Sequence, residues 1–309
     1  MAGGFKAIRP ETAGLLLGFV GVVIFGVTLP MTRLAVEVLD PLFVTTGRAA
    51  LAGLVACVVL LVSKKSFPVY RDRVSLMLAA ICLCAGFPGF TGYAMQHVDA
   101  SHGGVVLGII PLATAVTGSL VSHQRPSLGF WITALLGAAL VVGFSMQASG
   151  GSVSAGDLLL LGSVLSAAIG YSLAADVSTR LSGWEVISWI VVLALPVTLP
   201  VALWSSPVDP WAVSSLHWGA FLYLGLFSQY FGFFFWNAGL ALGGVAKVSQ
   251  VQLLQTFVTL AFAALINGET VGLTTWLVAL AVVGLVLLGR RMRVEKAGFV
   301  GNKTEKSLT

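Results

Sequence analysis

The sequence predicts an all-α integral membrane protein with ten transmembrane helices, arranged as two inverted five-helix repeats with both termini in the cytoplasm. Three observations lead to this prediction: the composition, a series of apolar segments of membrane-spanning length, and a repeat of the first half in the second. Hydrophobic residues make up 57% of the 309 positions and charged residues 9%, which leaves too little polar material to cover a soluble protein of this size.

Ten apolar segments are each long enough to cross a bilayer, for which a helix needs about 20 residues. We place these helices at 13–36, 41–62, 74–96, 102–122, 128–146, 156–179, 184–204, 217–241, 245–266 and 272–290. The connections carry turn residues and are too short to hold a folded soluble domain. The first segment is too long for a signal peptide and more spans follow it, so we expect an uncleaved helix.

The second half of the chain repeats the first at a spacing of about 143 residues. Residues 15–18 recur as 159–162, and the aromatic and glycine-containing stretch 87–93 recurs as 230–236. Because five is an odd number of spans, the second copy should enter the bilayer from the opposite side, as in many secondary transporters. We therefore divide the chain into a first repeat at 1–150, a second at 151–292, and a basic cytoplasmic tail at 293–309 that we expect to be disordered.

The basic residues predict the orientation. With the amino terminus in the cytoplasm, every Lys and Arg except Arg33 and Arg48 falls on the cytoplasmic side. These residues are Lys6, Arg9, Lys64, Lys65, Arg71, Arg73, Arg125, Arg180, Lys247, Arg290, Arg291, Arg293, Lys296, Lys303 and Lys306. The outer loops at 147–156 and 205–216 contain no Lys or Arg, as the positive-inside rule requires. The excess of 17 basic over 12 acidic residues thus reflects membrane topology, and we expect no nucleic-acid partner.

The motifs of membrane enzymes and ATP-driven pumps are missing from the chain. It has no His-Glu-x-x-His, no Gly-x-Ser-x-Gly, no pair of intramembrane aspartates and no phosphate-binding glycine loop followed by Lys and Ser or Thr. Its cysteines, Cys57, Cys82 and Cys84, fall in apolar spans without histidines at metal spacing. We therefore expect no enzymatic activity, no cofactor and no metal site, and a non-transport membrane protein is a remote alternative.

The predicted ninth helix carries the polar stripe best placed to line a substrate cavity. At 100° per residue, one arc of this helix contains Ser249, Gln252, Gln255, Thr256 and Thr259. Lipid offers these side chains no hydrogen-bonding partner, so the arc should face protein or water. Hydrogen bonding between helices and a wet cavity both fit this pattern, and we select Gln252 and Gln255 as candidate substrate-binding residues.

Aromatic residues gather on the predicted third and eighth helices. The candidates selected there are Phe87, Phe90, Tyr93, Tyr230, Phe233 and Asn237, and Thr28, Pro30 and Tyr171 complete the set from the first and sixth helices. Aromatic faces offer edge-to-face contacts to a planar ring, and an amide can hold the polar end of a substrate. The alternatives are ordinary packing, a packing kink at the proline, or an interfacial aromatic belt.

Two arginines lie within or at the end of predicted spans. Arg33 is one turn before Glu37, a spacing that favours a structural ion pair. Arg48 lies inside the second helix, where it can pair with acidic residues at the outer end or meet a substrate carboxylate. Both interpretations of Arg48 stay open, and we include it among the candidate substrate-binding residues.

The titratable residues do not suggest a proton relay. Asp176 is the only acidic residue inside a predicted helix away from a loop, and Arg180 four residues later gives it the spacing of a simple ion pair. The histidines, at positions 97, 102, 123 and 217, lie at or near loops. We therefore predict facilitated transport of a small substrate down its gradient, with proton antiport of drugs or other metabolites as the alternative.

Several motifs resemble those of the EamA family in the drug/metabolite transporter superfamily. They are Phe25-Gly26-Val27-Thr28-Leu29-Pro30, Gly47-Arg48 followed by Ala49-Ala50-Leu51-Ala52, Pro111, and Asn267-Gly268-Glu269. Within the family the chain looks most similar to YddG-type exporters of aromatic amino acids. The resemblance implies two five-helix repeats and alternating-access export of aromatic and other neutral amino acids across a bacterial inner membrane. One departure is His123-Gln124-Arg125, where the first repeat of the family usually carries Glu.

The predicted fifth and tenth helices should lie at the periphery of the bundle. Residues 135–144 and 277–289 contain no polar side chain, so we expect these helices to face lipid or a second copy of the chain. Glycines at GxxxG spacing, at 14–18 and 104–108, fit packing within the chain as well as a homodimer. A monomer is sufficient for the proposed transport.

Overall fold

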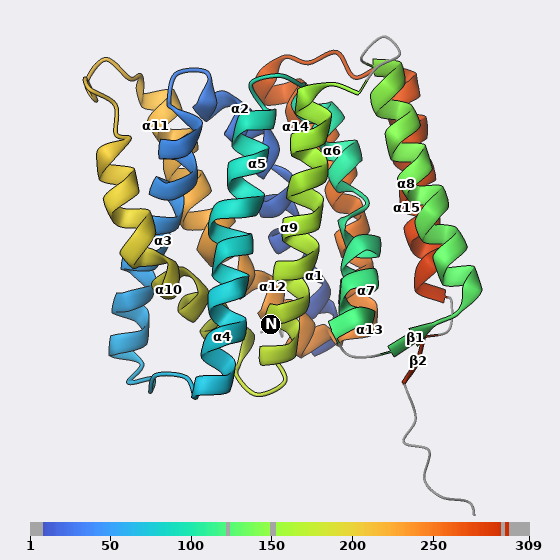
Figure 1. The fold of residues 1–309 in the computed structure, drawn as a ribbon, viewed down its shortest axis with the longest axis horizontal. Helices are drawn as coiled ribbons and strands as arrows, with labels where there is room; N and C mark the ends of the chain where they lie inside the picture. Colours follow the sequence, from blue (N-terminus) through green and yellow to red (C-terminus); the bar gives the residue numbers. More distant parts are fainter. Residues whose placement is uncertain (1–8, 122–123, 149–152, 292–293, 297–309) are drawn as a thin grey trace, which may run out of the picture.

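The computed structural model describes residues 9–121, 124–148, 153–291 and 294–296. Its helices run roughly along one common axis (Figure 1). Among these residues, eight helices are long and apolar enough to cross a membrane, and a shorter apolar helix covers Leu273–Gly289. The all-helical part of the prediction is therefore confirmed, whereas the count of ten spans stays a prediction. Most of the predicted tail at 293–309 lies outside the described residues.

The first half begins with two helices that meet end to end. Its elements are α1 (Pro10–Gly26), α2 (Thr28–Val36), α3 (Pro41–Val62), α4 (Tyr70–Ala80), the π-helical segment η1 (Ile81–Gly86), α5 (Phe87–Ala94), α6 (Ala100–Leu107), α7 (Ile110–Val121) and α8 (Leu128–Ala148). The start of α3 shows how the sequence sets a boundary. The Asp40 side chain accepts hydrogen bonds from the backbone N–H groups of Leu42 and Phe43, and Pro41 occupies the first helical position.

The second half has a similar order of helices, with the single helix α9 (Ala155–Val177) in place of α1 and α2. Its other elements are α10 (Gly183–Trp204), α11 (Ser215–Leu222), the π-helical segment η2 (Tyr223–Phe231), α12 (Gly232–Gly243), α13 (Val245–Val251), the 3₁₀ turn η3 (Gln252–Leu254), α14 (Gln255–Asn267) and α15 (Leu273–Arg291). A capping box between Ser154 and Asp157 starts α9, and Gly268, with φ of 67°, ends α14. Two short strands, β1 (Gln124–Pro126) and β2 (Val294–Lys296), pair antiparallel.

Two interruptions in the helices recur at equivalent places in the two halves, whereas the break between α1 and α2 has no equivalent in the continuous α9. The shift of about 143 residues brings η1 onto η2, and it brings the turn between α6 and α7 onto η3. The leading helices α1 and α9 run in opposite directions, because α2 and α9 end at opposite ends of the bundle (Figure 1). The repeat seen in the sequence thus extends to details of the backbone, and π-helical segments are frequent at functional sites.

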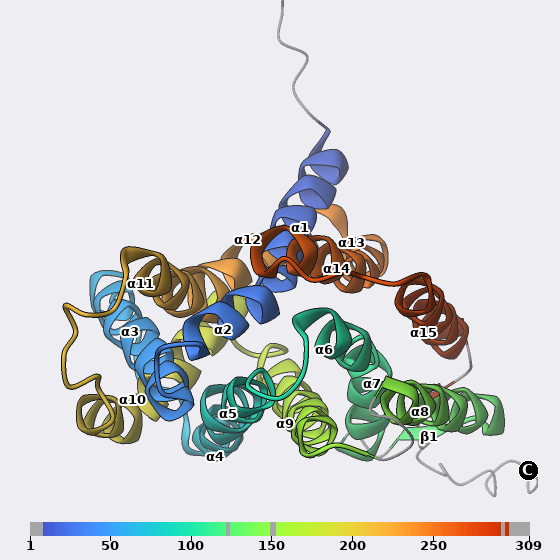
Figure 2. The same ribbon diagram turned by 90° about the horizontal axis from the view of Figure 1, so that it is seen from above.

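Helices of the two halves pack against each other in a nearly symmetric pattern. Two helices pack against their own equivalents, α3 on α10 and α8 on α15, and α6 of the first half packs against α14 of the second. The pair α1 and α12 has its counterpart in α9, which packs against α4 and α5. Figure 2 shows these two groups on either side of the bundle, with α8 and α15 at one edge. The space between these two groups is therefore bounded by helices of both halves.

Glycines allow α1 and α12 to cross at very short range. A Cβ atom on Gly14 would lie 2.2 Å from the backbone N of Gly243, and a Cβ on Gly239 would lie 2.6 Å from the backbone N of Gly18. No other residue permits such an approach. The glycine pair at 14–18 therefore serves packing within the chain. Gly104 of α6 and Gly108, directly after α6, similarly face Thr259 and Thr256 of α14.

Charged residues distinguish the two ends of the bundle. We define the upper face as the end with the connections 37–40, 95–99, 205–214 and 268–272, and the lower face as the end with 63–69 and 178–182, as drawn in Figure 1. Among the described residues, Arg33 is the only Lys or Arg near the upper face. The other described basic residues, apart from Arg48, lie at the lower ends of the helices, as expected of a cytoplasmic lower face.

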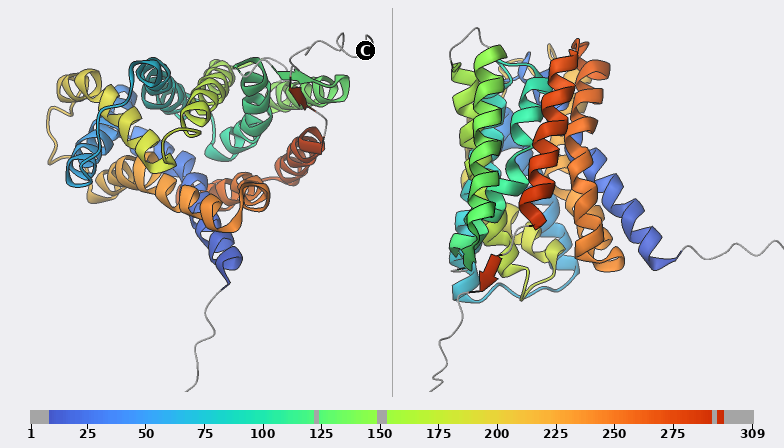
Figure 3. Two further views of the ribbon diagram at one scale, coloured as in Figure 1. Left: turned by 90° about the horizontal axis from the view of Figure 1, so that it is seen from below. Right: turned by 90° about the vertical axis from the view of Figure 1, so that its right-hand side faces the viewer.

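The helices α8 and α15 form the periphery. They lie side by side at one edge in the views from below and from the right (Figure 3). Apolar side chains cover their outward surfaces: Leu135 is 68% exposed and Leu277 is 56% exposed. Such a surface suits contact with lipid, as the absence of polar residues in both segments predicts.

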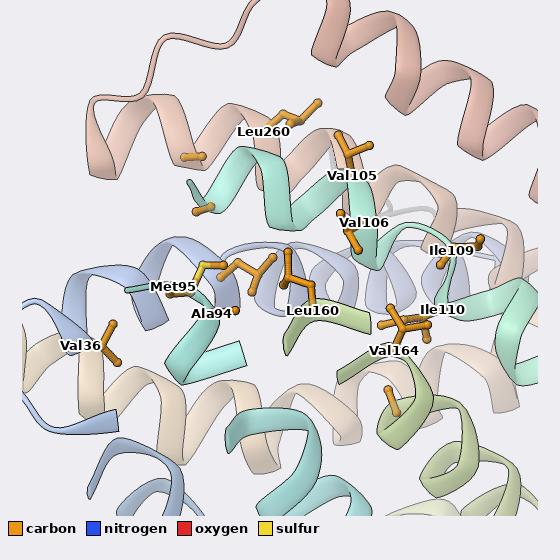
Figure 4. Close-up of a cluster of buried hydrophobic side chains, with 14 of the residues drawn as sticks. Val36, Ala94, Met95, Val105, Val106, Ile109, Ile110, Leu160, Val164 and Leu260 are labelled. Atoms are coloured by element: carbon orange, nitrogen blue, oxygen red, sulfur yellow. The ribbon is translucent and has the colours of Figure 1, made fainter. Parts of the chain in front are cut away.

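Buried apolar side chains close the upper half of the space between the repeats. Figure 4 shows part of this cluster, with Met95, Val106, Leu160 and Leu260 contributed by different segments. A Cβ atom on Gly103 of α6 would meet Met95 at 2.9 Å and Leu160 at 3.6 Å, so the segments are in close contact. The upper half of the bundle is therefore densely packed.

Candidate functional site

A cavity of about 340 Å³ lies between the two halves. Both repeats contribute to its wall. The first supplies residues of α1 to α3, η1 and α5 to α7, and the second supplies residues of α9, α10, η2, α12, η3, α14 and α15. Pockets for small molecules measure about 300–1,000 Å³, so this cavity suits a single small solute. Its position between inverted halves is where secondary transporters hold their substrates.

The cavity brings together more than half of the predicted substrate-binding residues. They are Thr28, Arg48, Phe87, Tyr171, Phe233, Gln252 and Gln255. These residues come from seven helical segments distributed over both halves of the chain. Only the packing of one half against the other places them around a common space.

Tyr230 lies outside the cavity wall, in contrast to the prediction. Its side chain is fully buried, its hydroxyl shares a 2.8 Å hydrogen bond with Ser188 Oγ of α10, and its ring packs edge-on against Phe234. The physical reason is the π-helical segment η2. The projection at 100° per residue assumes i→i+4 hydrogen bonding, whereas a π-helix has i→i+5 bonds and turns its side chains to different directions.

The other predicted residues absent from the wall face elsewhere. Phe90 and Tyr93 on α5 are 39% and 40% exposed, and Phe90 packs against α9 at Gly162. The carbonyl of Pro30 accepts a hydrogen bond from the Asn267 side chain. Asn237 packs against the start of α10. Phe90, Pro30 and Asn237 therefore contact neighbouring segments, Tyr93 is partly exposed, and none of the four is in the cavity wall.

Arg48 is the only charged residue in the cavity wall as the structure describes it. Its side chain is 2% exposed, and its Nη2 donates a 2.8 Å hydrogen bond to Ser228 Oγ, which in turn lies 2.8 Å from Thr28 Oγ1. Its Nε has no hydrogen-bond partner. Among the residues that the structure describes, no carboxylate forms an ion pair with it. The sequence-based alternative of a pair with outer acidic residues is therefore not formed.

Some polar residues of the predicted ninth helix line the cavity, and others form hydrogen bonds between helices. Gln252 and Gln255 line the cavity, and the backbone changes from 3₁₀ to α-helix between them. Thr259 also reaches the wall, but its hydroxyl donates a 2.8 Å hydrogen bond to the Gly26 carbonyl of α1. The stripe thus serves both a cavity and contacts between helices.

Sequence reasoning missed several residues of the wall. Ser228 and Gln229 belong to η2, and a Ser-Gln pair in the middle of an apolar span was the available signal. Gln229 Nε2 donates to the Leu83 carbonyl at 3.3 Å, which joins the two π-helical segments. Thr114 of α7 also belongs to the wall, and its buried Oγ1 has no hydrogen-bond partner. A buried polar atom without a partner is unfavourable unless a ligand or water satisfies it.

Arg33 has different partners from the one predicted. Its guanidinium forms ion pairs with Asp99 at 2.9 Å and with Glu269 at 3.6 Å, and it does not pair with Glu37. Glu37 lies 3.7 Å from His217 Nε2 instead. The difference arises from tertiary packing. Asp99 and Glu269, from the connections before α6 and after α14, lie close to the end of α2. The structural role predicted for Arg33 is retained, with acidic partners that are distant in the sequence.

Glu269 connects this cluster to the start of α6. Its carboxylate oxygens accept hydrogen bonds from the backbone N–H groups of Ala100 at 2.7 Å and Ser101 at 2.8 Å. A carboxylate at a helix amino terminus satisfies free N–H groups and interacts favourably with the helix dipole. At the corresponding lower-face position, the side chains of residues 124–126 are outside the described part of the chain.

Two further ionic contacts lie away from the cavity. Asp176 and Arg180 form the predicted ion pair at 2.8 Å, and Arg180 also pairs with the buried Asp72 of α4 at 2.8 Å. Hydrogen bonds to Asp176 and Asp72 raise the pKa of Arg180. At the upper face His102 Nε2 lies 2.7 Å from Asp157, a buried contact that the sequence analysis did not anticipate. Neither contact reaches the cavity wall.

Comparison with known proteins identifies relatives along nearly the whole chain. The EamA-like transporter family matches residues 12–146 and again residues 154–290. The chain is 44% identical over 285 residues to "Uncharacterized transporter YdeK" of Bacillus subtilis (strain 168), covering 92% of this chain and 99% of that protein. It is 26% identical over 282 residues to "Uncharacterized transporter sll0355" of Synechocystis sp. (strain ATCC 27184 / PCC 6803 / Kazusa), covering 82% of this chain and 83% of that protein.

A solved structure shares the fold. A chain described as "Crystal structure of protein" aligns with a TM-score of 0.60 and 16% identity, over 91% of this chain and 99% of that chain. This similarity concerns the fold alone. The family match to both halves and the extended similarity to a curated transporter together show that the chain belongs to the EamA-like transporter family of membrane transporters.

Proposed function

We propose that the protein is a secondary transporter that exports small amphipathic metabolites, chiefly aromatic and other neutral amino acids, by alternating access around its central cavity. The observation that carries the proposal is the composition of the cavity wall, which combines aromatic rings, amide and hydroxyl groups, and one guanidinium. A zwitterionic amino acid with a planar side chain presents complementary groups to each of these.

The aromatic part of the wall supports binding of a planar side chain. Phe25 and Phe233 lie with ring centroids 4.8 Å apart, and both line the cavity with Phe87, Tyr171 and Trp236. Aromatic rings supply apolar area and favour tilted or edge-to-face contacts with another ring. Amphipathic drugs share this feature, so the aromatic wall alone does not distinguish them from amino acids.

The polar part of the wall favours a solute with a carboxylate. Arg48 brings the only formal charge among the described lining residues, and its Nε lacks a partner. A carboxylate can accept charge-assisted hydrogen bonds from a guanidinium, and these are stronger than bonds between neutral groups. Gln252 and Gln255 can hold other polar atoms of the same solute.

The position of the cavity supports a conformation that faces the lower side. The wall reaches Ala175 near the lower end of α9, whereas above Leu29 and Gly104 the space is filled by the buried cluster. With the predicted orientation, the lower face is cytoplasmic. An exporter would load its substrate in this conformation and release it after the two halves, at 1–150 and 151–292, rearrange as inverted repeats around the cavity.

The charges in the wall support transport without proton coupling. The described lining residues include no Asp, Glu or His that could exchange a proton with the substrate site. Proton antiport is the second candidate, and the buried contact of His102 with Asp157 is the observation that favours it. That contact lies at the upper ends of α6 and α9, apart from the wall.

Flux through purified protein in liposomes tests the proposal. Aromatic amino acids, other neutral amino acids and amphipathic drugs would be offered in turn, with and without an imposed pH gradient. We expect uptake of aromatic amino acids that needs no pH gradient and is absent from protein-free liposomes. Uptake only of drugs, or uptake that requires the pH gradient, would contradict the proposal, and loss of proton dependence in His102→Gln would then support antiport.

The remaining features of the proposal concern the membrane. We propose ten transmembrane segments with both termini in the cytoplasm of a bacterial cell and the chain in its inner membrane. A single copy contains both halves of the cavity wall, so a monomer is sufficient for transport. Labelling of single cysteines from either side of the membrane tests the topology: a cysteine at position 65 should react from the cytoplasm and one at 208 from outside.

A further inference from the structure

We propose that Arg48 makes this carrier an exchanger, in which a carboxylate-bearing solute must occupy the cavity before the two halves can rearrange at full speed. The inference rests on the proposed transport function and adds a requirement to it. Uptake into empty vesicles should be slow, and uptake against an internal carboxylate substrate should be fast. The required chemical class is therefore a solute with a free carboxylate.

The first argument is the difference between Arg48 and the two arginines that form ion pairs, Arg33 and Arg180. Arg33 has two acidic partners and Arg180 also has two. Arg48 is more deeply buried than either, but its one described hydrogen bond goes to the neutral Ser228 hydroxyl. Burial of a charge is unfavourable unless an opposite charge compensates it. The missing partner should therefore come from outside the chain.

The second argument is the location of the unsatisfied groups. Arg48 and Thr114 both belong to the cavity wall, and each has a buried atom without a hydrogen-bond partner, Nε in Arg48 and Oγ1 in Thr114. The two residues come from α3 and α7. A solute that brings a carboxylate into the cavity supplies a counter-charge next to the Arg48 guanidinium, which an apolar ligand cannot do.

The third argument concerns movement. The hydrogen-bonded chain from Arg48 through Ser228 to Thr28 joins α3 and α2 of the first half to η2 of the second. Alternating access changes the contacts between the halves, so this junction must rearrange. In an intermediate closed at both faces, an empty cavity would leave the guanidinium with less water and no counter-charge. A bound carboxylate removes that penalty, which makes the loaded carrier the faster one.

The experiment measures uptake of labelled tryptophan into proteoliposomes with different internal contents. The lumen would contain buffer, unlabelled tryptophan, tryptophanamide or tryptamine. We expect internal tryptophan to accelerate uptake by about tenfold or more, which corresponds to about 1.4 kcal/mol in the barrier. The two analogues keep the ring and lack the carboxylate, so they should not accelerate it. Equal uptake in all four preparations would overturn the exchange inference and leave the transporter in place.

Other outcomes are equally decisive. Acceleration by tryptophanamide as strong as by tryptophan would overturn the carboxylate requirement. No tryptophan uptake in any preparation would overturn the proposed transport of aromatic amino acids and the exchange inference with it. These results separate the two proposals without any mutation, so they hold even if a variant fails to fold.

Variants assign the effect to Arg48. In Arg48→Gln, the uptake that remains should not be accelerated by internal tryptophan, and Arg48→Lys should restore part of the acceleration because it keeps the charge. Arg71→Gln is the matched control, since it removes an exposed arginine at the lower end of α4, away from the cavity. Acceleration in Arg48→Gln as large as in the unmodified protein would contradict the assignment.

Discussion

Arg33 and Arg48 show how two arginines in the same half of a membrane protein acquire opposite roles. Arg33 lies near the upper face with Asp99 and Glu269, and its acidic partners come from other connections of the fold. Arg48 faces the cavity, and its described hydrogen-bond partner is a neutral hydroxyl. An arginine whose charge is neutralised by acidic residues of the same protein has a structural role. A buried arginine without an acidic partner indicates a site for a negatively charged ligand group.

Replacement of Arg48 should give the largest effect on transport. We expect Arg48→Gln to lower the uptake of carboxylate substrates by about 100-fold, because a charge-assisted hydrogen bond contributes about 1.5–3 kcal/mol. Its melting temperature in detergent should not fall, since the substitution removes an uncompensated buried charge. Uptake in liposomes and thermal unfolding measure the two effects. If Arg48→Gln clearly loses stability but keeps normal uptake, Arg48 has a structural role like that of Arg33.

Replacement of Glu269 should mainly affect stability. Glu269→Gln removes the negative charge from the Arg33 cluster and weakens the hydrogen bonds to the start of α6. We expect a loss of about 2 kcal/mol, because the Glu269 side chain is 6% exposed and breaking a paired charge there leaves Arg33 less compensated. Thermal or denaturant unfolding in detergent measures it.

Asp99 provides the matched control for Glu269. It pairs with the same arginine, but its side chain is 60% exposed. Asp99→Asn should therefore reduce stability by less than about 1 kcal/mol. Equal losses in the two variants would show that burial does not determine the strength of this cluster.

The neutral wall residues should have smaller effects than Arg48. Gln252→Ala should lower uptake by about tenfold, because a neutral hydrogen bond contributes about 0.5–1.5 kcal/mol. Tyr230→Phe is the contrast, since its hydroxyl bonds to Ser188 and lies outside the wall. That variant should keep normal uptake and lose about 1 kcal/mol of stability. Impaired uptake with unchanged stability in Tyr230→Phe would return this residue to the substrate site.

Much of the fold could be predicted from the sequence because membrane spans depend on local properties. Apolar length sets the helices, and the repeat of 15–18 as 159–162 indicates the duplication. The eighth predicted span, 217–241, shows the limit: it is helical throughout, but its centre at Tyr223–Phe231 is π-helical. No apolar pattern reveals that change in hydrogen bonding.

The candidate site was predicted less completely because it depends on how segments that are distant in the sequence pack together. Gln252 and Gln255 were recognisable since polar groups in a membrane helix must face protein or water. Tyr230 was misplaced because the helix projection does not hold through η2. The partners of Arg33 come from the connections before α6 and after α14, and a spacing rule along one helix identifies only Glu37. Which charges meet depends on how the two halves pack.

The ion pair at the lower face extends the comparison to an exposed charge and should give the smallest effect. Asp176 is 43% exposed in its pair with Arg180, whereas Asp72, the second partner of the same arginine, is 4% exposed. We expect Asp176→Asn to reduce stability by about 0.5 kcal/mol or less and to leave uptake unchanged, because exposed pairs are weakened by solvent. Asp72→Asn should reduce it more, because Asp72 is buried against the same guanidinium. Unfolding in detergent ranks the two variants, and a larger loss in Asp176→Asn would mean that the helical pair, and not the contact between α4 and the end of α9, holds Arg180 in place.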